Sequence, residues 1–349
     1  MAFYRRGFFR CAALAALMGL SFGRCVAGPG RMPAALNTTN VTIAGVAYTD
    51  ARVFFSRYGF KASWTMDGHG LRFQSAKVRI EIEADKRDVQ LNGVHVILGD
   101  AVIARGGTLY LTHIDAEKLF TPVLNPAGVS TPPAPALRVI VIDPGHGGQD
   151  TGTQNKVLHL NEKTFTLDVG LRLRALLLKQ GYKVVMTRTD DHFVPLPERA
   201  EIANKAGASL FISIHFNSVE GASMVCGTET YTMTPQFQRS TSTANTQRDA
   251  GDAMNYPGNG NDPWNTVLGY HIQNQLLGKL DSIDRGLKRA RFAVLRLVNA
   301  PAVLVESGYL SNTIEARKIC TTAYRDEIAE GIAEGVRAYA LATTTAKAR

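Results

Sequence analysis

Apolar and polar residues alternate with a period of two in the first third of the chain. Val78, Ile80 and Ile82 alternate with charged residues, which is the pattern of a strand with one buried face. Further along, an Asn-Gly pair at 92–93 separates two short apolar runs, as is typical of a tight β-hairpin. The pattern predicts a small β-rich domain over 38–122.

Strand-like and helix-like patterns alternate in the rest of the chain. Continuous apolar runs predict strands at 137–142, 183–186, 210–214, 292–297 and 302–305. Apolar residues at helical spacing predict helices at 165–177, 198–206, 266–280 and 324–340. This alternation indicates an α/β domain over 138–342, in which helices cover both faces of a mainly parallel sheet.

A segment rich in proline and alanine, 121–137, connects the two parts. Proline removes backbone donors and holds the chain near polyproline geometry, so the segment is expected to be extended. We place the linker proper at 123–137.

The first 27 residues have the order of zones that a secretory signal requires. Arg5, Arg6 and Arg10 precede an apolar run of about 12 residues, and small residues follow before a cleavage point at Gly28. The run is too short to span a bilayer, and the alternative of a buried N-terminal helix does not explain this order. We therefore expect export to the periplasm or to the extracellular cell wall. No later run is long enough to span a membrane, so the mature chain is expected to have no transmembrane segment.

Cleavage of the signal segment lowers the net charge of the chain. The whole chain has 39 Lys and Arg against 30 Asp and Glu, a formal charge of +9 that is compatible with nucleic-acid binding. Residues 1–27 contain four arginines and no acid, so cleavage leaves +5. Much of the excess of positive charge therefore belongs to the signal segment, and no nucleic-acid partner is expected.

Four residues that can carry chemistry lie just beyond strands or at the start of a helix. His146 follows the first strand of the α/β part, His215 follows the third, Glu306 ends the last, and Glu162 opens the first helix. Because ligands bind at the carboxyl ends of strands in such sheets, these side chains are expected to converge. Two histidines and one carboxylate suit Zn²⁺ and leave a coordination position open for water. The glycines around His146 fit neither a dinucleotide fingerprint nor a P-loop.

These residues stand in a set of motifs that runs in order through about 200 residues. The motifs are VIDPGHGG, NEK, RT, ERAEIAN, SIHFN and PAVLVESGYLSN, at 141–148, 161–163, 188–189, 198–204, 213–217 and 301–312. They resemble zinc-dependent N-acetylmuramoyl-L-alanine amidases of the Amidase_3 type. The resemblance implies a three-layer α/β/α fold, a Zn²⁺ held by His146, Glu162 and His215, and Glu306 as the catalytic glutamate.

The reaction implied by the resemblance is hydrolysis of peptidoglycan. The bond cleaved would join the lactyl group of N-acetylmuramic acid to L-alanine of the stem peptide. Zinc would activate a water molecule, and Glu306 would take the water proton and deliver it to the alanine nitrogen. Two alternatives remain open at this point: a catalytically silent wall-binding or activator protein, and a zinc peptidase that cuts within the stem. The expected partner is peptidoglycan, and a protein activator stays open.

The N-terminal part carries a second, shorter resemblance. The stretch 88–119 is similar to copper amine oxidase N-terminal-like domains, with a strand, an Asn-Gly turn, a strand, a Gly-Gly turn and a short helix. The name does not imply copper here, because His69, His95 and His113 show no ligand spacing. A role in wall adhesion or as a spacer is the expectation.

Several residues have two interpretations that the sequence leaves open. Arg285 and Lys288 can bind carboxylates of the stem peptide or can form a solvated basic face, and Asn217 can orient a metal ligand or contact substrate. Cys226 and Cys320 survive signal cleavage and can form a disulfide or remain separate thiols. His159, His192 and His271 lie outside the metal pattern.

A long polar segment, 234–265, interrupts the α/β part. It lacks apolar helical periodicity, and a segment of this length in a compact domain is usually functional, so we interpret it as a loop that shapes the substrate site. Autoinhibition stays open, with four acidic residues in or near the segment as candidates to fill the free zinc position. These candidates are Glu229, Asp249, Asp252 and Asp262.

Overall fold

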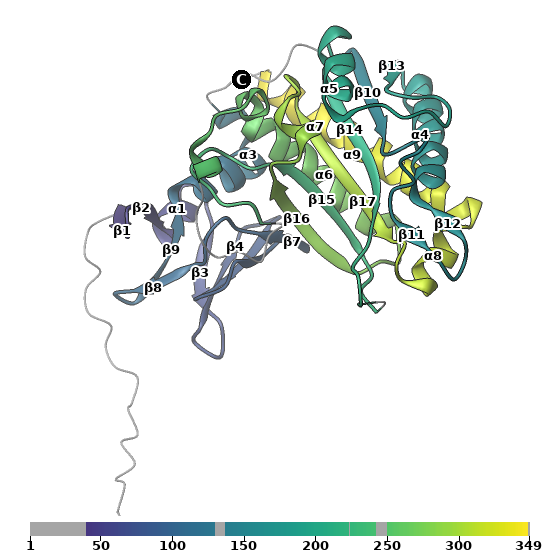
Figure 1. Cartoon of the computed structure of the whole chain (residues 1–349). Helices are drawn as coiled ribbons and strands as arrows, with labels where there is room; N and C mark the ends of the chain where they lie inside the picture. Colours follow the sequence, from purple (N-terminus) through teal and green to yellow (C-terminus); the bar gives the residue numbers. More distant parts are fainter. Residues whose placement is uncertain (1–39, 130–136, 223, 242–249, 348–349) are drawn as a thin grey trace, which may run out of the picture. The chain divides into compact units, whose positions relative to one another are not determined.

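One large mixed sheet runs through the protein (Figure 1). The computed structural model describes residues 40–129, 137–222, 224–241 and 250–347. In this described part, eleven strands pair in the order β13-β10-β14-β17-β15-β16-β7-β6-β5-β4-β3. The sheet therefore joins strands of the α/β part to strands of the N-terminal part.

The α/β part contributes the first six strands of this order. They are β10 (Val139–Pro144), β13 (Lys183–Met186), β14 (Leu210–Asn217), β15 (Thr228–Met233), β16 (Asp284–Ala290) and β17 (Ala302–Tyr309). β13, β10, β14 and β17 are parallel, whereas β15 pairs antiparallel to β17 and parallel to β16. The predicted α/β class with a mainly parallel sheet is confirmed, and a short antiparallel pairing lies within it.

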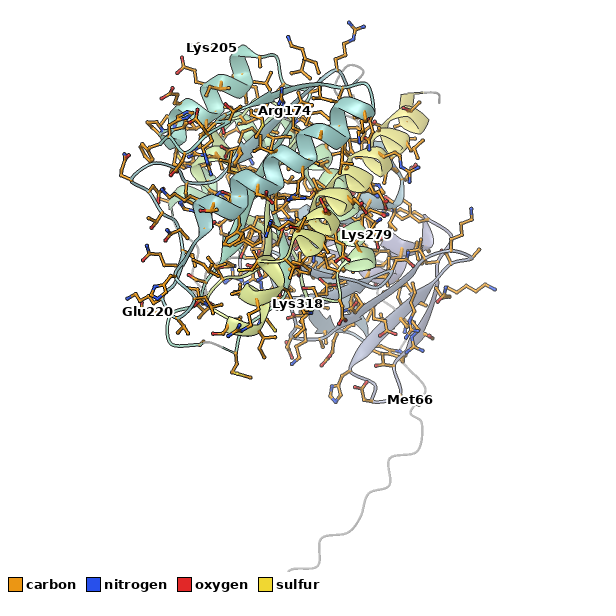
Figure 2. The ribbon with its side chains drawn as sticks, turned by 90° about the vertical axis from the view of Figure 1, so that its right-hand side faces the viewer. Met66, Arg174, Lys205, Glu220, Lys279 and Lys318 are labelled. Atoms are coloured by element: carbon orange, nitrogen blue, oxygen red, sulfur yellow. The ribbon has the colours of Figure 1, made fainter. Side chains whose placement is uncertain are left out.

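Helices cover both faces of these strands. α4 (Glu162–Lys179), α6 (Asp262–Lys279) and α9 (Thr322–Lys347) share one apolar core with the sheet. Figure 2 shows α4, which carries Arg174, beside the yellow α9. α5 (Leu196–Lys205) and α7 (Ala293–Arg296) pack against the opposite face.

Side chains alternate between these faces along each strand, as the geometry of a strand requires. On β14, Ile212 and Ile214 belong to the core under α4, α6 and α9, whereas Phe211 belongs to the core under α5 and α7. His215 is one residue beyond Ile214 and therefore faces the α5 side. Because of this alternation, only polar side chains on the same face of neighbouring strands can contact one another.

One predicted strand is wrong. Residues 292–297 contain the short helix α7, and the strand that precedes β17 is β16 at Asp284–Ala290. A short apolar run does not distinguish a strand from a helix by its period. β16 was missed because it carries Lys288 and Arg289, whose charges are paired inside the protein.

The N-terminal part is β-rich, as predicted. Its strands are β1 (Asn40–Ile43), β2 (Val46–Asp50), β3 (Lys61–Trp64), β4 (Gly70–Gln74), β5 (Arg79–Glu83), β6 (Asp88–Leu91), β7 (Val94–Ile97), β8 (Ile103–Arg105) and β9 (Thr108–Thr112). β1, β2, β9 and β8 form a second sheet. Between β6 and β7, Asn92 and Gly93 have φ of 51° and 85°, the left-handed conformations of the predicted hairpin turn. Met66 lies at the outer turn between β3 and β4 (Figure 2).

Short helices complete the described part of the chain. They are α1 (Ala51–Ser56), α2 (His113–Asp115), η1 (Ala116–Phe120), α3 (Thr121–Leu124), η2 (Pro126–Gly128), η3 (Ala250–Ala253), η4 (Pro257–Asn261) and α8 (Thr313–Ile319), and a two-stranded ladder joins β11 (Gln154–Asn155) to β12 (Leu160–Asn161). The predicted linker therefore starts as helix rather than as extended chain, and 130–136 lie outside the described residues. The predicted signal segment, 1–27, also lies outside them. No helix in the described ranges is long and apolar enough to cross a membrane.

The two parts meet across β7 and β16, which pair in parallel through Val96 and Leu287. Leu287 and Tyr270 belong to the apolar core of the N-terminal part, although they come from the α/β part. All described residues belong to one compact unit. The division into a small β-rich domain at 38–122, a linker at 123–137 and an α/β domain at 138–342 stays a prediction.

Asp115 forms the buried polar link at this junction. Its carboxylate is fully buried and accepts hydrogen bonds from Arg289 Nη1 at 2.7 Å, Gln238 Nε2 at 2.7 Å and Thr112 Oγ1 at 2.7 Å. Gln238 belongs to the polar segment 234–265, whose neighbouring residue Arg239 pairs with Asp100 at 2.8 Å. The N-terminal part thus holds both β16 and the polar segment of the α/β part.

Two tryptophans allow this coupling to be measured. Trp64 lies in β3 and Trp264 in α6, so Trp64→Phe and Trp264→Phe variants each leave one fluorescent reporter. Because the parts share a sheet and a buried ion pair, we expect the fluorescence of the remaining tryptophan and the far-UV circular dichroism of the whole chain to give the same denaturant midpoint within each variant. Asp115→Ala should lower the free energy of unfolding by about 3–5 kcal/mol, since it leaves Arg289 buried without its partner. Two separate transitions, or an effect no larger than that of Asp281→Ala at the surface, would contradict the coupling.

Candidate active site

The loop after β10 presents His146 at a left-handed backbone conformation, with φ of 63°. Close packing around the histidines requires glycine at two positions. A Cβ atom on Gly145 would lie 2.2 Å from Cε1 of His215, and one on Gly152 would lie 2.6 Å from Oε2 of Glu162. The Gly-rich loop therefore allows close approach of the side chains to one another.

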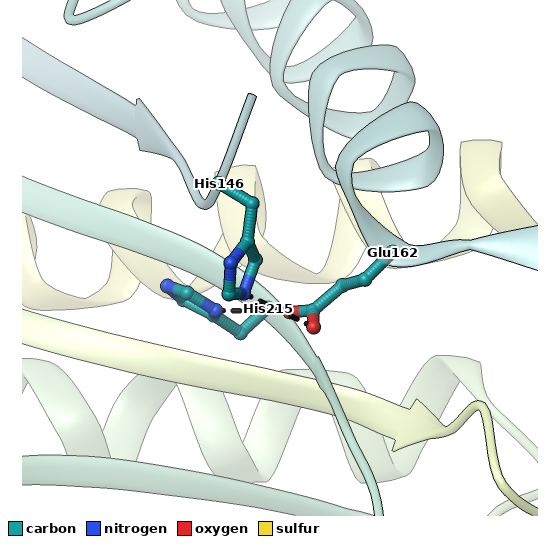
Figure 3. A group of neighbouring side chains, drawn as sticks. All are labelled: His146, Glu162 and His215. Atoms are coloured by element: carbon teal, nitrogen blue, oxygen red, sulfur yellow. Dashed lines mark hydrogen bonds and ion pairs between the residues drawn. The ribbon is translucent and has the colours of Figure 1, made fainter. Parts of the chain in front are cut away.

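His146, Glu162 and His215 lie together, as predicted (Figure 3). His146 comes from the β10 loop, Glu162 from the first turn of α4 and His215 from β14. His146 Nε2 lies 3.1 Å from Glu162 Oε2, and His215 Nδ1 lies 2.9 Å from Glu162 Oε1. One nitrogen or oxygen from each of the three residues falls within 4.8 Å of the others. In the described part of the chain this is the group of His, Cys, Asp or Glu side chains that can hold a metal ion.

Glu162 is held ionised inside the protein. Burial opposes its charge, but hydrogen bonds from His146 and His215 outweigh burial and lower the pKa of the carboxyl. Its oxygens also accept the backbone N–H groups of Thr153 at 2.8 Å and Phe216 at 3.0 Å. For His146, burial lowers the pKa, but the carboxylates of Glu162 and Asp150 reverse this and raise it.

Asp150 orients His146 from the side away from Glu162. Its Oδ2 lies 2.9 Å from His146 Nδ1, which leaves Nε2 of the same ring directed at Glu162. A carboxylate behind a histidine fixes the ring and its tautomer, as is usual at metal sites. Asp150 is not among the residues predicted from the sequence; the available signal was an acidic residue four positions after His146 in the same loop.

Two buried arginines support this loop through its carbonyl groups. Arg199, on α5, donates to Asp143 Oδ1 at 2.7 Å and to the carbonyl oxygen of His146 at 2.7 Å. Arg188 donates to the carbonyl oxygens of Pro144 at 3.0 Å and Gly145 at 2.8 Å. Both arginines belong to motifs that the sequence analysis noted without assigning a role.

Glu306 lies on β17 between His215 on β14 and Glu229 on β15. Its Oε2 atom is buried and has no hydrogen-bond partner among the described residues. Burial, followed by the negative charges of Glu162 and Glu229, raises the pKa of its carboxyl well above the ordinary value. A buried carboxylate oxygen without a protein partner is a site for a bound polar group.

A cavity of about 530 Å³ contains this constellation. His146, Glu162, His215 and Glu306 all line it. The donor set suits Zn²⁺, since neutral imidazole is its usual nitrogen ligand and ionised carboxylate its usual oxygen ligand. The residue with this unpartnered oxygen, Glu306, lines the same cavity as the candidate metal set, His146, Glu162 and His215.

Of the three residues predicted to contact substrate, one lines the cavity and two do not. Asn217 lines the cavity and donates from Nδ2 to Glu229 Oε1 at 2.6 Å. Lys288 forms an ion pair with Glu229, and Arg285 donates from Nε to the carbonyl oxygen of Cys226 at 2.7 Å. Neither Lys288 nor Arg285 is among the residues that line the cavity. Their role in substrate binding stays a prediction.

In the described part of the chain, Cys226 is half-buried, Cys320 is exposed, and each is a free thiol. The structure thus has the two cysteines as separate thiols, and their pairing after export stays a prediction.

Three of the acidic candidates for filling the metal site have other partners. Glu229 pairs with Lys288, Asp252 with Arg291 at 2.7 Å, and Asp262 accepts from Asn259 at 3.0 Å. The fourth, Asp249, lies outside the described residues.

Comparison with known proteins gives one family. The model of the N-acetylmuramoyl-L-alanine amidase family Amidase_3 matches residues 140–338, which include the metal set and Glu306. CwlM, an N-acetylmuramoyl-L-alanine amidase of Bacillus licheniformis, is 37% identical over 210 residues, covering 59% of this chain and 71% of CwlM. AmiC of Escherichia coli O6:H1 is 34% identical over 221 residues, covering 58% of this chain and 52% of AmiC, so the match spans about half of that relative.

A solved structure shows a similar extent of match. The crystal structure of an N-acetylmuramoyl-L-alanine amidase from Clostridium difficile 630 is 31% identical, covers 59% of this chain and 97% of its own, and has a TM-score of 0.49. The N-terminal part, including 88–119, lies outside the range matched by the family model.

The role of Asp150 can be tested by metal affinity. Asp150→Ala removes the acceptor that holds His146, so we expect Zn²⁺ affinity to fall roughly 10- to 100-fold in a competition titration with a chelator. Asp190→Ala is the matched control, since this aspartate has a side chain that is 73% exposed. Equal affinity in the two variants would show that Asp150 does not position His146.

Proposed function

The chain belongs to the N-acetylmuramoyl-L-alanine amidase family, and from this premise we propose that it hydrolyses the amide bond between the lactyl group of N-acetylmuramic acid and L-alanine in peptidoglycan. One observation carries the proposal. A group of two histidines and a glutamate that suits a metal ion shares a cavity with a buried, unpartnered glutamate oxygen.

His146, Glu162 and His215 would hold a Zn²⁺ ion. When bound, the ion supplies Lewis-acid activation of water and of the amide carbonyl. The structure supports this assignment through the donor types, through the glycines that let the ligands approach, and through Asp150 behind His146. Three protein ligands are the usual number at a catalytic zinc site.

Glu306 would move the protons of the reaction. Water attacks the amide carbonyl carbon, and Glu306 accepts a proton from that water. As the bond from the carbonyl carbon to the alanine nitrogen breaks, Glu306 returns the proton to that nitrogen, which leaves a carboxyl on the lactyl group and an amine on alanine. Burial, followed by the charges of Glu162 and Glu229, raises the pKa of its carboxyl, which makes the carboxylate a stronger base toward the water proton.

We further propose that the protein works on the cell wall after export. The support is the signal-like order of residues 1–27 and the peptidoglycan substrate that the family name implies. The remaining charge of +5 is compatible with an anionic wall. Binding of a protein activator stays a proposal, and we assign no surface of the protein to it.

Two competing functions predict different products. Purified peptidoglycan is incubated with the zinc-loaded protein, and the newly freed amino termini are identified. We expect free L-alanine amino termini. Other termini would instead indicate a peptidase acting within the stem, and the absence of any release would indicate a wall-binding protein without catalysis.

The glutamate role can be separated from metal binding by one substitution. Glu306→Gln keeps the size of the side chain but removes the base, so turnover should fall by roughly 10² to 10⁴ while the bound zinc per chain is unchanged. Glu327→Gln, on the exposed side of α9, should leave both quantities unchanged. Full activity in Glu306→Gln would remove this residue from the mechanism.

A further inference from the structure

A second buried glutamate lies beside Glu306 in the sheet. Glu229, on β15, is directly opposite Glu306 of β17, and Glu306 is in turn opposite His215 of β14. Because the side chains of paired residues lie on the same face of a sheet, Glu229 continues the row that begins at the metal set. Its side chain is 1% exposed, and it is not among the residues that line the cavity. Glu229 thus reaches the cavity only through its neighbours.

Three donors point at the carboxylate of Glu229. Oε1 accepts from Nδ2 of Asn217 at 2.6 Å and from the hydroxyl of Tyr231 at 2.7 Å. Oε2 accepts from the ammonium group of Lys288, which compensates the negative charge. Burial raises the pKa of Tyr231, so its hydroxyl keeps its proton and remains a donor. A carboxylate suits this place because it accepts on both oxygens and brings no donor of its own.

The carboxylate decides which way the carboxamide of Asn217 is turned. An ionised carboxylate cannot donate, so Nδ2 of Asn217, and not Oδ1, must face Glu229. Oδ1 in turn accepts the backbone N–H of Ser218 at 2.8 Å. Nδ2 carries two N–H groups, and the second has no partner among the described residues. Since Asn217 lines the cavity together with Glu306, this N–H is available to an acceptor there.

A bulge lies between the metal set and this asparagine. His215 is opposite Glu306 and Asn217 is opposite Tyr309, so the register of β14 against β17 shifts within two residues. Bulges re-aim side chains and are common beside active sites. Asn217 and Glu229 belong to the two strands that flank β17, so their side chains meet across that strand. The contact therefore ties β14 to β15 next to Glu306.

We propose that Glu229 is a positioning residue for the hydrolytic site. It fixes the carboxamide of Asn217, whose free N–H donates to a carbonyl oxygen of the bound substrate. Lys288 belongs to the same arrangement, because a buried carboxylate without a cation would be costly. This assignment rests on the proposed function.

A double-mutant cycle tests whether Glu229 acts through Asn217. The rate at which L-alanine amino termini are released from peptidoglycan is measured for zinc-loaded Glu229→Gln, Asn217→Ala and their combination. Asn217→Ala should lower the rate about tenfold, since one hydrogen bond to substrate is lost. Glu229→Gln should lower it at least as much, because glutamine brings two N–H groups against the donors around it. The loss caused by Glu229→Gln should be about tenfold smaller when Asn217→Ala is already present.

The cycle also separates this role from a direct effect of charge. The negative charge of Glu229 acts on Glu306 as well, but that effect does not pass through Asn217. It should therefore be equal in the presence and in the absence of Asn217→Ala, and only the hydrogen bond contributes to the coupling.

The side-chain amide of Asn217 gives a readout that does not depend on catalysis. In ¹H–¹⁵N spectra of the zinc-loaded protein, its peaks are those that Asn217→Ala removes. An N–H that donates to a carboxylate is deshielded, so one proton peak should lie downfield, and Glu229→Gln should return it to the ordinary carboxamide range. Asp168→Asn is the control, since this carboxylate pairs with Arg172 on α4 at 2.7 Å, and it should change neither the rate nor these peaks.

One further variant guards against a failure to fold. If Glu229→Gln leaves Lys288 unpaired and the chain does not fold, Glu229→Gln combined with Lys288→Met removes both charges and takes its place in the cycle. Losses that multiply in the combined variant, an unchanged rate in Asn217→Ala, or amide peaks that stay in place in Glu229→Gln would overturn the proposal. Failure of the proposed function has a different signature, since the unmodified protein would then release no L-alanine termini from peptidoglycan.

Discussion

The site depends on one ionised carboxylate placed inside the protein. Glu162 is 2% exposed, and a buried anion is costly unless charges and hydrogen bonds compensate it. Here two imidazoles and two backbone N–H groups point at its oxygens. A divalent cation would complete this compensation. The β10 loop, α4 and β14 therefore have to meet at Glu162, and the placement of these elements sets the geometry of the whole cavity.

The sheet places Glu306 beside this group of side chains. Neighbouring strands in register place His215 and Glu306 side by side, and the two-residue period of each strand turns both toward the face covered by α5 and α7. Arg199 links this group to the wall of the cavity. Its guanidinium donates to the carbonyl oxygen of His146 and to that of Val194, in the segment that carries Phe193. The chemistry and the cavity wall are thus fixed by the same buried residues.

Much of this could be predicted from sequence, because the relevant signals are local. The metal set and Glu306 stand at ends of strands or at a helix start, where the fold class itself predicts convergence. Asp150 and Arg199 could not be given roles from the sequence, since these roles consist of contacts with a ring nitrogen and with backbone carbonyls. β16 was missed for a related reason: the charge of Arg289 suggests solvent, but its partner Asp115 lies 174 positions away in the sequence. The linkage of the N-terminal part to the sheet is visible only in three dimensions.

Zinc-edge anomalous diffraction from crystals of the zinc-loaded protein would locate the bound metal ion. We expect one strong anomalous peak within coordination distance of a ring nitrogen of His146, a ring nitrogen of His215 and a carboxylate oxygen of Glu162, inside the cavity that Glu306 lines. A peak held by other residues, or no peak at these three side chains, would contradict it.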